Sequence, residues 1–374
     1  MKYYIIAGEA SGDLHASNLM ADIKKNDPMA TFRCWGGDLM IAQGAEIVKH
    51  IREISFMGFA EVLSNLRTIL RNIRLCKSDI DRYNPDALIL VDYPGFNLKI
   101  AAYAHQKGYK VIYYISPQIW AWKQSRVYAI KKNVDKMMVI LPFEKEFYKR
   151  FDYEADFVGH PLLDAIDNYK KKHDGNQFRN EFNLGEQPIV ALLPGSRKQE
   201  ISRMLKIMVS VCEDFKDVQF VVAGAPSIGP EFYAALLHDR KVKIVYNRTY
   251  DLLETASAAL VTSGTATLET ALFDVPEVVC YKGSWFSYLI ARMVIRVKYI
   301  SLVNLIMDKK IVTELIQSDL SKANLVRDLQ QLLHDTQYVN QLKSDYLLLK
   351  HKLGDSGASK KAAAVISACL NKNQ

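Results

Sequence analysis

The residues with the strongest chemical character lie in a turn near the start of the chain. An apolar run at residues 3–7 precedes the turn, a helical pattern follows it, and its sequence is Gly8-Glu9-Ala10-Ser11-Gly12-Asp13. In open α/β sheets, ligands bind at the carboxyl ends of strands, where this turn is expected, and its glycines let the backbone approach a ligand closely. The turn is therefore a candidate site. The alternative is a common strand–helix loop in which Asp13 caps a helix.

A second carboxylate follows a buried strand expected at residues 87–91, in the loop Asp92-Tyr93-Pro94-Gly95-Phe96-Asn97. A carboxylate directly after such a strand is well placed to act as a general base, because Pro94 and Gly95 fix the turn around it. The alternative is that Asp92 caps the next helix. The pattern taken alone favours the capping role.

Two loops in the second half of the chain have the character of phosphate-binding loops. Gly195 and Ser196 begin a helix whose free N–H groups can receive phosphate, and Arg197 adds a planar cation suited to a diphosphate. The other loop contains small and hydroxylated residues that allow a pyrophosphate to lie against the backbone, namely Ser263, Gly264, Thr265, Ala266 and Thr267. Glu269, one turn further on, is placed to accept hydrogen bonds from vicinal hydroxyls such as those of a ribose.

Other motifs argue against competing chemistries. Asp79-Ile80-Asp81 resembles a metal-binding motif of some sugar transferases. The stretch is expected to be helical, however, and side chains two positions apart on a helix point in different directions, so they are not expected to share a metal ion. The phosphate loop GxxxxGK followed by Ser or Thr is absent from the sequence, as is GxGxxG. Their absence weakens the case for an ATPase or a dinucleotide oxidoreductase. The histidines are dispersed and do not form a metal set, so no metal site is expected.

The elements that must position these loops alternate between short β-branched or aromatic runs and helical patterns. Strands are expected at residues 3–7, 31–35, 87–91, 111–115, 136–140, 156–158, 189–193, 219–223, 243–246, 259–262 and 277–281. The alternation predicts two doubly wound, Rossmann-like α/β domains with parallel sheets and a helical C-terminal tail. A lysine-rich stretch at 168–176 is the expected linker. The expected domains are residues 1–170, completed by the C-terminal helices at 345–374, and residues 185–344.

Composition sets broad limits on the function. The 374 residues are 49% hydrophobic and 24% charged, and the net charge of +8 implies attraction to an anionic partner. The five cysteines lack metal-ligand spacing, which indicates free thiols in a reducing compartment. Neither a signal peptide nor a membrane-spanning run is evident in the sequence. A cytoplasmic protein is expected.

Two apolar and basic stretches suggest contact with lipid. The first supplies Phe56, Met57, Phe59, Leu66, Arg67, Arg71 and Arg74, and the second supplies Trp285, Phe286, Arg292 and Arg296. A basic amphipathic helix can lie in an anionic interface or accept acyl chains. The alternative is an ordinary helix packed on its sheet, and periodicity alone favours this alternative for the first stretch.

Five motifs spread over nearly the whole chain carry a resemblance to a known family. They are Gly8-Glu9-Ala10-Ser11-Gly12-Asp13, Ser116-Pro117-Gln118-Ile119-Trp120-Ala121-Trp122, Val158-Gly159-His160-Pro161-Leu162, Leu193-Pro194-Gly195-Ser196-Arg197 and Ser263-Gly264-Thr265-Ala266-Thr267-Leu268-Glu269. In this order they resemble the lipid-A-disaccharide synthases. The resemblance implies the two-domain GT-B architecture, with both domains facing a central cleft. It also implies transfer of 2,3-diacylglucosamine from its UDP derivative to 2,3-diacylglucosamine 1-phosphate (lipid X), with the UDP-sugar as substrate and no cofactor.

The resemblance also assigns residues to the two substrates. The UDP group would contact Gly195, Ser196, Arg197, Ser263, Gly264, Thr265, Ala266, Thr267 and Glu269, with Asn304, Glu314 and Gln317 lining the donor side. The acceptor and the catalysis would involve Glu9, Ser11, Gly12, Asp13, Asp92 and Asn97. The family implies a protein peripherally associated with the cytoplasmic face of the inner membrane. Its precedent of C-terminal exchange between protomers leaves a homodimer open.

One departure from the family pattern affects the catalytic assignment. Many relatives carry a second acid where this chain has Gly95, so only Asp92 can supply a base from this loop. This raises Asp92 above its capping alternative, while Glu9 stays a rival base or a partner. The expected reaction is a single in-line displacement with inversion.

Two other classes of protein remain alternatives at this stage. A UDP-sugar epimerase of the same architecture would need no lipid surface, and the apolar and basic stretches argue against it. A nucleic-acid binder is suggested only by charge, because the basic residues are spread out and no recognition motif occurs.

Overall fold

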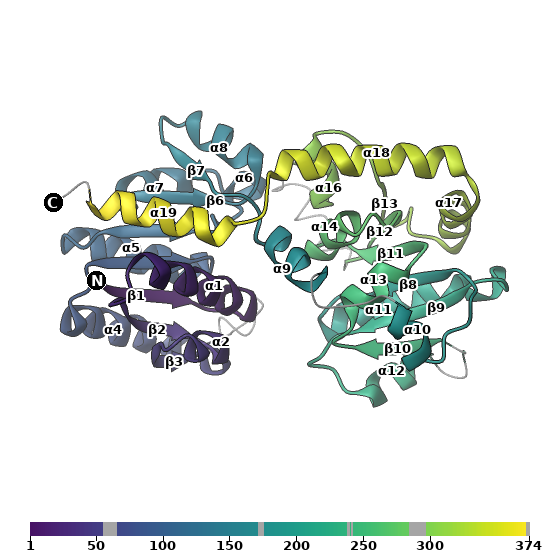
Figure 1. Ribbon diagram of the computed structural model, residues 1–374, viewed down its shortest axis with the longest axis horizontal. Coiled ribbons are helices and arrows are strands. Elements are labelled where there is room, and N and C mark those ends of the chain that lie inside the picture. Colours follow the sequence, from purple (N-terminus) through teal and green to yellow (C-terminus); the bar gives the residue numbers. More distant parts are fainter. Residues whose placement is uncertain (55–65, 171–175, 238–239, 241, 284–296, 372–374) are drawn as a thin grey trace. The chain divides into compact units, whose positions relative to one another are not determined.

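Two parallel β-sheets organise the chain, each in its own unit of the fold (Figure 1). A computed structural model describes residues 1–54, 66–170, 176–237, 240, 242–283 and 297–371. Met1–Pro161 and Asp355–Gln374 form the first unit, and Leu162–Gly354 forms the second.

The first unit contains a seven-stranded sheet in the order β3-β2-β1-β4-β5-β6-β7. Its strands are β1 (Lys2–Ala7), β2 (Thr31–Gly36), β3 (Glu46–His50), β4 (Ala87–Val91), β5 (Val111–Tyr114), β6 (Lys136–Val139) and β7 (Ala155–Phe157). The chain adds β2 and β3 on one side of β1, then adds β4 to β7 on the other side. The strand order therefore reverses between β1 and β4, which makes the carboxyl ends of these two strands the expected binding crevice.

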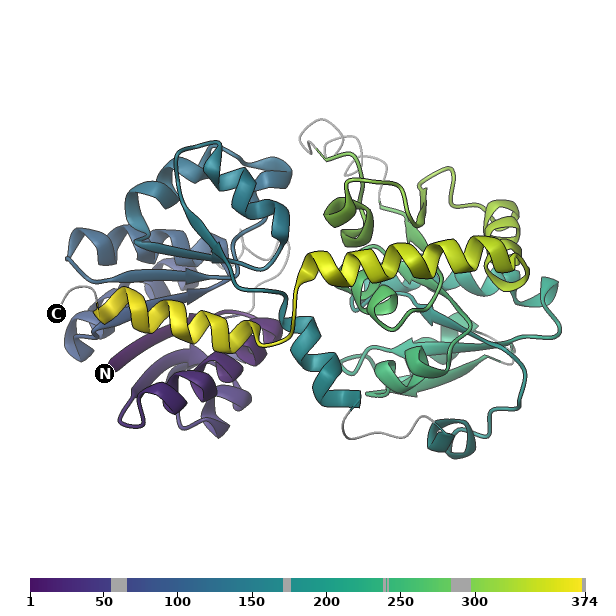
Figure 2. The ribbon, with the colours of Figure 1, turned by 45° about the horizontal axis from the view of Figure 1, so that its top comes forward.

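Helices cover this sheet. They are α1 (Ala10–Asn26), α2 (Asp38–Ala42), α4 (Leu66–Tyr83), α5 (Pro94–Gln106), α6 (Ile119–Trp122), α7 (Arg126–Asn133), α8 (Pro142–Lys149) and the C-terminal α19 (Ala358–Asn371), with a short 3-10 turn at Ile51–Glu53. Helix α19 lies beside α1, as Figures 1 and 2 show, and its Ala362, Ala363 and Ile366 belong to the same buried core as β1 and α1. The last segment of the chain thus completes the unit that the first segment begins.

The second unit repeats the same design with six parallel strands in the order β10-β9-β8-β11-β12-β13. These are β8 (Ile189–Leu193), β9 (Gln219–Gly224), β10 (Lys243–Tyr246), β11 (Ala258–Thr262), β12 (Glu277–Tyr281) and β13 (Thr313–Ile316). Here the order reverses between β8 and β11. The helices are α9 (Pro161–Lys170), α10 (Asn176–Glu181), α11 (Lys198–Met208), α12 (Pro230–Leu237), α13 (Thr249–Thr255), α14 (Thr265–Leu272), α16 (Leu302–Met307), α17 (Lys322–His334) and α18 (Thr336–Leu353), with a 3-10 turn at Val209–Asp214.

Continuous burial explains why the central strands form where the sequence predicts them. Every residue of β4, β8 and β11 is buried, as expected for parallel strands that are covered on both faces. The sequence did not predict the edge strands β3 and β13. In these strands few side chains are fully buried, so the apolar signal is weak.

The chain passes from the first unit to the second after Pro161 and returns after Gly354, whereas the sequence placed these boundaries near residues 170 and 345. Helix α18 packs against α14, α16 and α17 in the second unit (Figure 2), whereas α19 belongs to the first unit. Helix α9 continues to Lys170, inside the expected linker at 168–176, and residues 171–175 lie outside the described part.

One buried carboxyl in the second unit makes the stability of the fold depend on pH. Glu277 at the start of β12 is 1% exposed, and neither of its carboxyl oxygens has a hydrogen-bond partner among the described residues. Burial, together with the charge of Glu314, raises the pKa of Glu277 well above its ordinary value. The folded state therefore binds a proton that the unfolded chain has released at neutral pH, and stability falls as the pH rises above the ordinary glutamate range.

We expect Glu277→Gln to raise the melting temperature, because the variant folds without taking up that proton. The gain over the wild type should be larger at pH 8 than at pH 5, which thermal unfolding at both pH values measures. An equal change at both pH values would show that ionisation of Glu277 does not limit stability.

Candidate functional site

The first candidate site lies where β1 and β4 leave the first sheet. Ala7 is paired with Val91, so the chain emerges at Gly8 and at Asp92 on the same level of adjacent strands. Burial raises the pKa of Asp92 to about 6, and the negative charge of Glu9 adds to this shift. The structure therefore brings together the two carboxylates that the sequence singled out, close enough to influence each other.

Tyr93 holds this corner of the unit together. Its ring lies against Gly8, where a Cβ atom would come within 2.3 Å of the ring, so the turn requires a glycine. The Tyr93 hydroxyl donates to the carbonyl oxygen of Ile54 at 3.1 Å, and the ring stacks on Phe96. The sequence analysis gave Tyr93 no role, because aromatic contacts between distant segments leave no local pattern.

Asp13 acts on a neighbouring helix. Its carboxylate accepts hydrogen bonds from the backbone N–H groups of Gly37 (2.7 Å), Leu39 (3.1 Å) and Met40 (3.2 Å) at the start of α2. Both of its oxygens are thereby engaged in capping a helix other than its own. Glu9 is half-buried and Ser11 is exposed, so these two are the polar side chains of the turn that remain accessible to a ligand.

Asn97, expected to contact the acceptor, is completely buried. Its side-chain amide donates to the carbonyl oxygens of Asp92 (2.7 Å), Val91 (3.3 Å) and Ile6 (3.4 Å). Through these hydrogen bonds to the backbone, Asn97 joins the ends of β1 and β4.

The second candidate site is a pocket of about 520 Å³ at the carboxyl ends of β8, β9 and β11, within the usual size range of small-molecule sites. Leu193 is paired with Val261, so the two predicted phosphate loops leave the sheet on the same level. The lining consists of Leu193, Gly195, Ser196, Arg197, Glu200, Ala223, Gly224, Ala225, Pro226, Thr249, Thr262, Ser263, Gly264, Thr265, Ala266 and Glu269. The pocket thus unites the residues of both loops, except for Thr267, which is fully buried and donates to the Gly264 carbonyl oxygen at 2.9 Å.

Two helices begin at the rim of this pocket. Helix α14 begins at Thr265 directly after Gly264, and α11 begins at Lys198 after the Gly195 loop. Gly195 has a left-handed φ of 104°, a conformation that favours glycine. Two helix N-termini and the Arg197 guanidinium in one pocket form an environment that favours an anion such as a diphosphate.

Glu200 is a lining residue that the sequence analysis missed. Its Oε2 atom accepts a hydrogen bond from the backbone N–H of Ser196 at 3.2 Å. The Glu200 carboxylate thus occupies an N–H group that the phosphate loop would otherwise offer to a ligand. It occupies the first turn of α11, where acidic residues are common. Because an acidic residue is common at this position, nothing in the sequence indicated that Glu200 also contacts the phosphate loop.

Glu269 is held by Tyr250, another residue that the sequence analysis did not identify. The Tyr250 hydroxyl donates to Glu269 Oε1 at 3.1 Å, and burial raises the pKa of Glu269. Tyr250 lies on α13 and Glu269 on α14, so only the tertiary structure creates this contact.

Asn304, Glu314 and Gln317, expected on the donor side, are not among the lining residues. Glu314 accepts hydrogen bonds from the backbone N–H groups of Ile300 and Ser301, from the Ser301 hydroxyl (2.8 Å) and from the Asn304 amide (2.9 Å). This network anchors the segment that precedes α16. It reaches the pocket through Ser263, whose hydroxyl donates to the Ile300 carbonyl oxygen at 2.9 Å.

The residues expected to contact lipid are only partly described. Phe56, Met57, Phe59, Trp285, Phe286, Arg292 and Arg296 lie outside the described residues. On α4, Leu66 is 48% exposed and Leu70 is 44% exposed, beside exposed Arg67, Arg71 and Arg74. The other side of α4 packs inward through buried Ile73, Cys76 and Ile80. The helix thus packs on the sheet and also presents leucines and arginines to solvent.

Within the described ranges, no helix has the length and apolar character needed to cross a bilayer. Those ranges also contain no group of three or more His, Cys, Asp or Glu side chains that could hold a metal ion. Asp79 pairs with Arg33, and Asp81 accepts from the Tyr103 hydroxyl, so these two carboxylates face different partners as expected.

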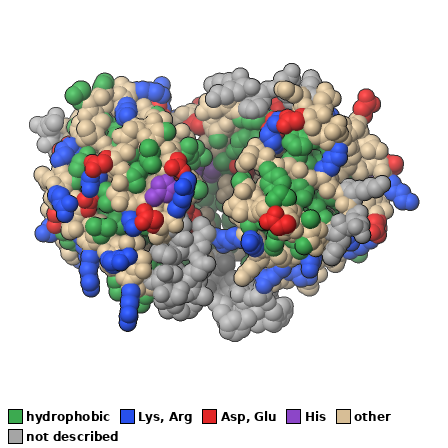
Figure 3. All heavy atoms as spheres, turned by 90° about the horizontal axis from the view of Figure 1, so that it is seen from below, with side chains coloured by type: hydrophobic (Ala, Val, Ile, Leu, Met, Phe, Trp, Pro, Cys, Tyr) green, Lys and Arg blue, Asp and Glu red, His purple; other side chains and the backbone are tan. Residues whose placement is uncertain are grey.

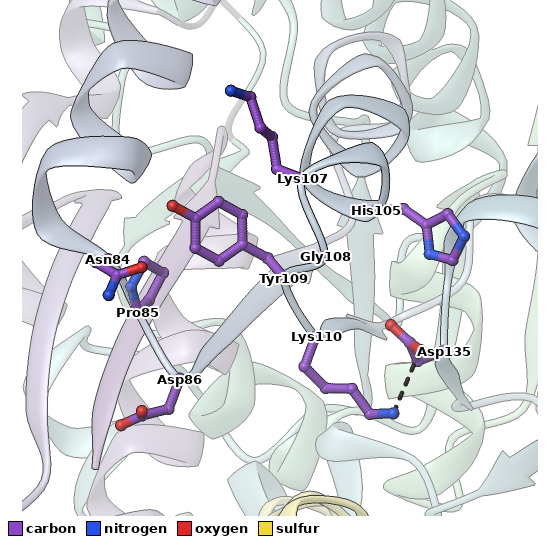
Figure 4. Close-up of a pocket in the computed structure, with 9 residues that line it drawn as sticks. All are labelled: Asn84, Pro85, Asp86, His105, Lys107, Gly108, Tyr109, Lys110 and Asp135. Carbon is purple, nitrogen blue, oxygen red and sulfur yellow. Dashed lines mark hydrogen bonds and ion pairs between the residues drawn. The ribbon is translucent and has the colours of Figure 1, made fainter.

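A further pocket lies at the opposite edge of the first sheet (Figure 4). Asp86, Lys110 and Asp135 precede β4, β5 and β6, so this pocket is at the amino ends of the strands, away from Asp92. Lys110 and Asp135 form an ion pair at 3.3 Å. The pocket lining contains two aspartates and two lysines. On the face shown in Figure 3, the described Lys and Arg side chains are interspersed with acidic and apolar ones.

Comparisons with known proteins agree with the motifs. The family model for "Lipid-A-disaccharide synthetase" matches residues 3–366. The lipid-A-disaccharide synthase of Geobacter sulfurreducens is 36% identical over 98% of this chain and 97% of its own length, and that of Nitrosococcus oceani is 38% identical over 98% and 95%.

Solved structures show the same fold at much lower identity. The UDP-GlcNAc 2-epimerase of Neisseria meningitidis, bound to UDP-GlcNAc, has a TM-score of 0.65 at 12% identity, with 100% of both chains covered. The calicheamicin glycosyltransferase CalG4 has a TM-score of 0.61 at 15% identity and covers 99% of this chain and 98% of its own. Identities this low show a shared fold, which is the GT-B architecture expected from the sequence.

Glu200 provides a test of the pocket's affinity for anions. We expect Glu200→Gln to bind UDP, used as a diphosphate probe, roughly threefold to tenfold more tightly, because a negative charge no longer lies on the Ser196 N–H. Titration calorimetry measures the affinity. Glu186→Gln, the same change at an exposed site before β8, is the control and should bind UDP like the wild type. Weaker binding by Glu200→Gln would assign Glu200 a role in holding the loop instead.

Proposed function

This chain belongs to the lipid-A-disaccharide synthetase family, and from that premise we propose that it moves 2,3-diacylglucosamine from its UDP derivative to the 6-hydroxyl of lipid X. The products are lipid A disaccharide 1-phosphate and UDP. The observation that carries the proposal is the family match over residues 3–366, which include both strand-end sites.

The second unit supplies the donor half of the reaction. The diphosphate of the UDP-sugar binds against the Gly195–Ser196 loop before α11 and against the start of α14 at Thr265, with Arg197 beside it. Glu269 accepts hydrogen bonds from the ribose. The convergence of these groups in one pocket supports this assignment. As the bond to UDP breaks, Arg197 and the backbone N–H groups stabilise the negative charge that grows on the leaving diphosphate.

The first unit supplies the base. Asp92 removes the proton from the acceptor 6-hydroxyl while its oxygen attacks the anomeric carbon, and UDP leaves from the opposite face with inversion. A pKa of about 6 supports this role, because the carboxylate is largely ionised at neutral pH and more basic than an ordinary aspartate. Glu9 raises the basicity of Asp92 and orients the acceptor.

Contact with the membrane is the remaining part of the proposal. Both substrates carry acyl chains, so the enzyme must reach them at a lipid surface. Exposed Leu66 and Leu70 beside Arg67, Arg71 and Arg74 on α4 suit the anionic cytoplasmic face of the inner membrane. The net charge of +8 acts in the same direction.

The central test is acceptor-dependent release of UDP. The purified protein, incubated with UDP-diacylglucosamine, should release UDP only when lipid X is present, and Asp92→Asn should lower turnover by about 10²–10⁴-fold while still binding UDP. Chromatography of the lipid product and calorimetry of UDP binding measure the two effects. Isomerised sugar nucleotide formed without lipid X would indicate an epimerase, and near-normal turnover by Asp92→Asn would remove Asp92 as the base.

The pH profile tests the coupling of the two carboxylates. Activity should rise with pH through the pKa of Asp92, because the base acts when deprotonated. Removal of the neighbouring negative charge in Glu9→Gln lowers that pKa, so the acidic limb of kcat/KM should move to lower pH. Glu154→Gln, an exposed glutamate before β7 in the same unit, is the matched control. An unmoved limb in Glu9→Gln would mean that Asp92 does not sense Glu9.

A further inference from the structure

Two buried side chains converge on one backbone atom next to the catalytic carboxylate. The Tyr113 hydroxyl donates to the carbonyl oxygen of Asp92 at 2.6 Å, and the Asn97 amide donates to the same oxygen at 2.7 Å. Both side chains are completely buried. The hydroxyl comes from β5 and the amide from α5, so two separate elements hold the same carbonyl group.

The backbone of Asp92 needs such support. Asp92 and Tyr93 both have left-handed φ angles, 45° and 48°, and two consecutive residues with side chains rarely adopt this conformation. The N–H of Asp92 still donates to the Tyr114 carbonyl oxygen in the sheet, but its own carbonyl turns away from the ladder. Without Tyr113 and Asn97, that carbonyl would lose both of its side-chain donors.

The backbone of Asp92 is held on both sides of its Cα atom, by the Tyr114 carbonyl at its N–H and by Tyr113 and Asn97 at its carbonyl oxygen. These bonds together restrain φ and ψ of Asp92, and the direction of its Cα–Cβ bond follows from them. Burial raises the pKa of Tyr113 well above its ordinary value, so its hydroxyl keeps the proton that it donates. We infer that Tyr113 is a positioning residue that aims the Asp92 carboxylate, an inference that rests on the proposed role of Asp92 as the base.

The test compares two Tyr→Phe variants, each of which removes one hydrogen bond from a tyrosine hydroxyl to a backbone carbonyl oxygen. Tyr113→Phe should lower kcat by about tenfold to a hundredfold, as expected when a catalytic group is misplaced, with the KM for the UDP-sugar unchanged. Tyr153→Phe is the matched control, because its hydroxyl donates to the Val134 carbonyl oxygen at 2.9 Å, at the amino edge of the same sheet. Thermal unfolding of both variants measures the loss of stability that they share.

A double variant separates this inference from the proposed function. If Tyr113 acts through Asp92, then Tyr113→Phe should cause no further loss in the Asp92→Asn background. Equal kcat values for Tyr113→Phe and Tyr153→Phe, or a further loss in the double variant, would overturn the inference while leaving Asp92 as the base. Near-normal turnover by Asp92→Asn alone would overturn the proposed function, and the inference with it.

If Tyr113→Phe does not fold, a second variant carries the same test. Asn97→Asp keeps the size of the side chain but exchanges the amide donor for an acid, so it removes the other half of the support. It should lower kcat with the KM for the UDP-sugar unchanged. A normal kcat in a folded Asn97→Asp variant would overturn the inference.

Discussion

The reversal of strand order within each sheet is the constraint on which the rest of the structure depends. Parallel strands joined by helices leave the sheet at the same edge, and where the order reverses, two adjacent loops diverge in opposite directions. In the first unit the diverging loops follow β1 and β4, and in the second they follow β8 and β11. Each of the four loops that carry unusual polar residues is one of these.

The same arrangement serves two different kinds of chemistry. At β1 and β4, burial and mutual repulsion make a carboxylate more basic, which suits the removal of a proton. At β8 and β11, glycines and helix starts present N–H donors, which suits the binding of a diphosphate. The fold supplies the location, and the side chains at each location decide the chemistry.

Several polar residues of these loops maintain the geometry of the site through contacts with the protein itself. Asp13 caps α2, Asn97 ties β1 to β4, and Glu314 with Asn304 anchors the segment before α16. Their hydrogen bonds are with other groups of the protein, so their effect on a ligand is indirect. A motif can therefore combine groups that meet a substrate with groups that hold the first set in place.

The sequence by itself determined the fold class, the central strands and the positions of the four site loops, because buried strands and glycine-rich turns are local patterns. The half-buried edge strands β3 and β13 lack such a pattern. Only the tertiary structure decided that α18 belongs to the second unit, that Glu200 and Tyr250 belong to the pocket site, and that Tyr113 supports Asp92. These contacts join residues on different elements or loops, and no local spacing records which side chains meet after folding.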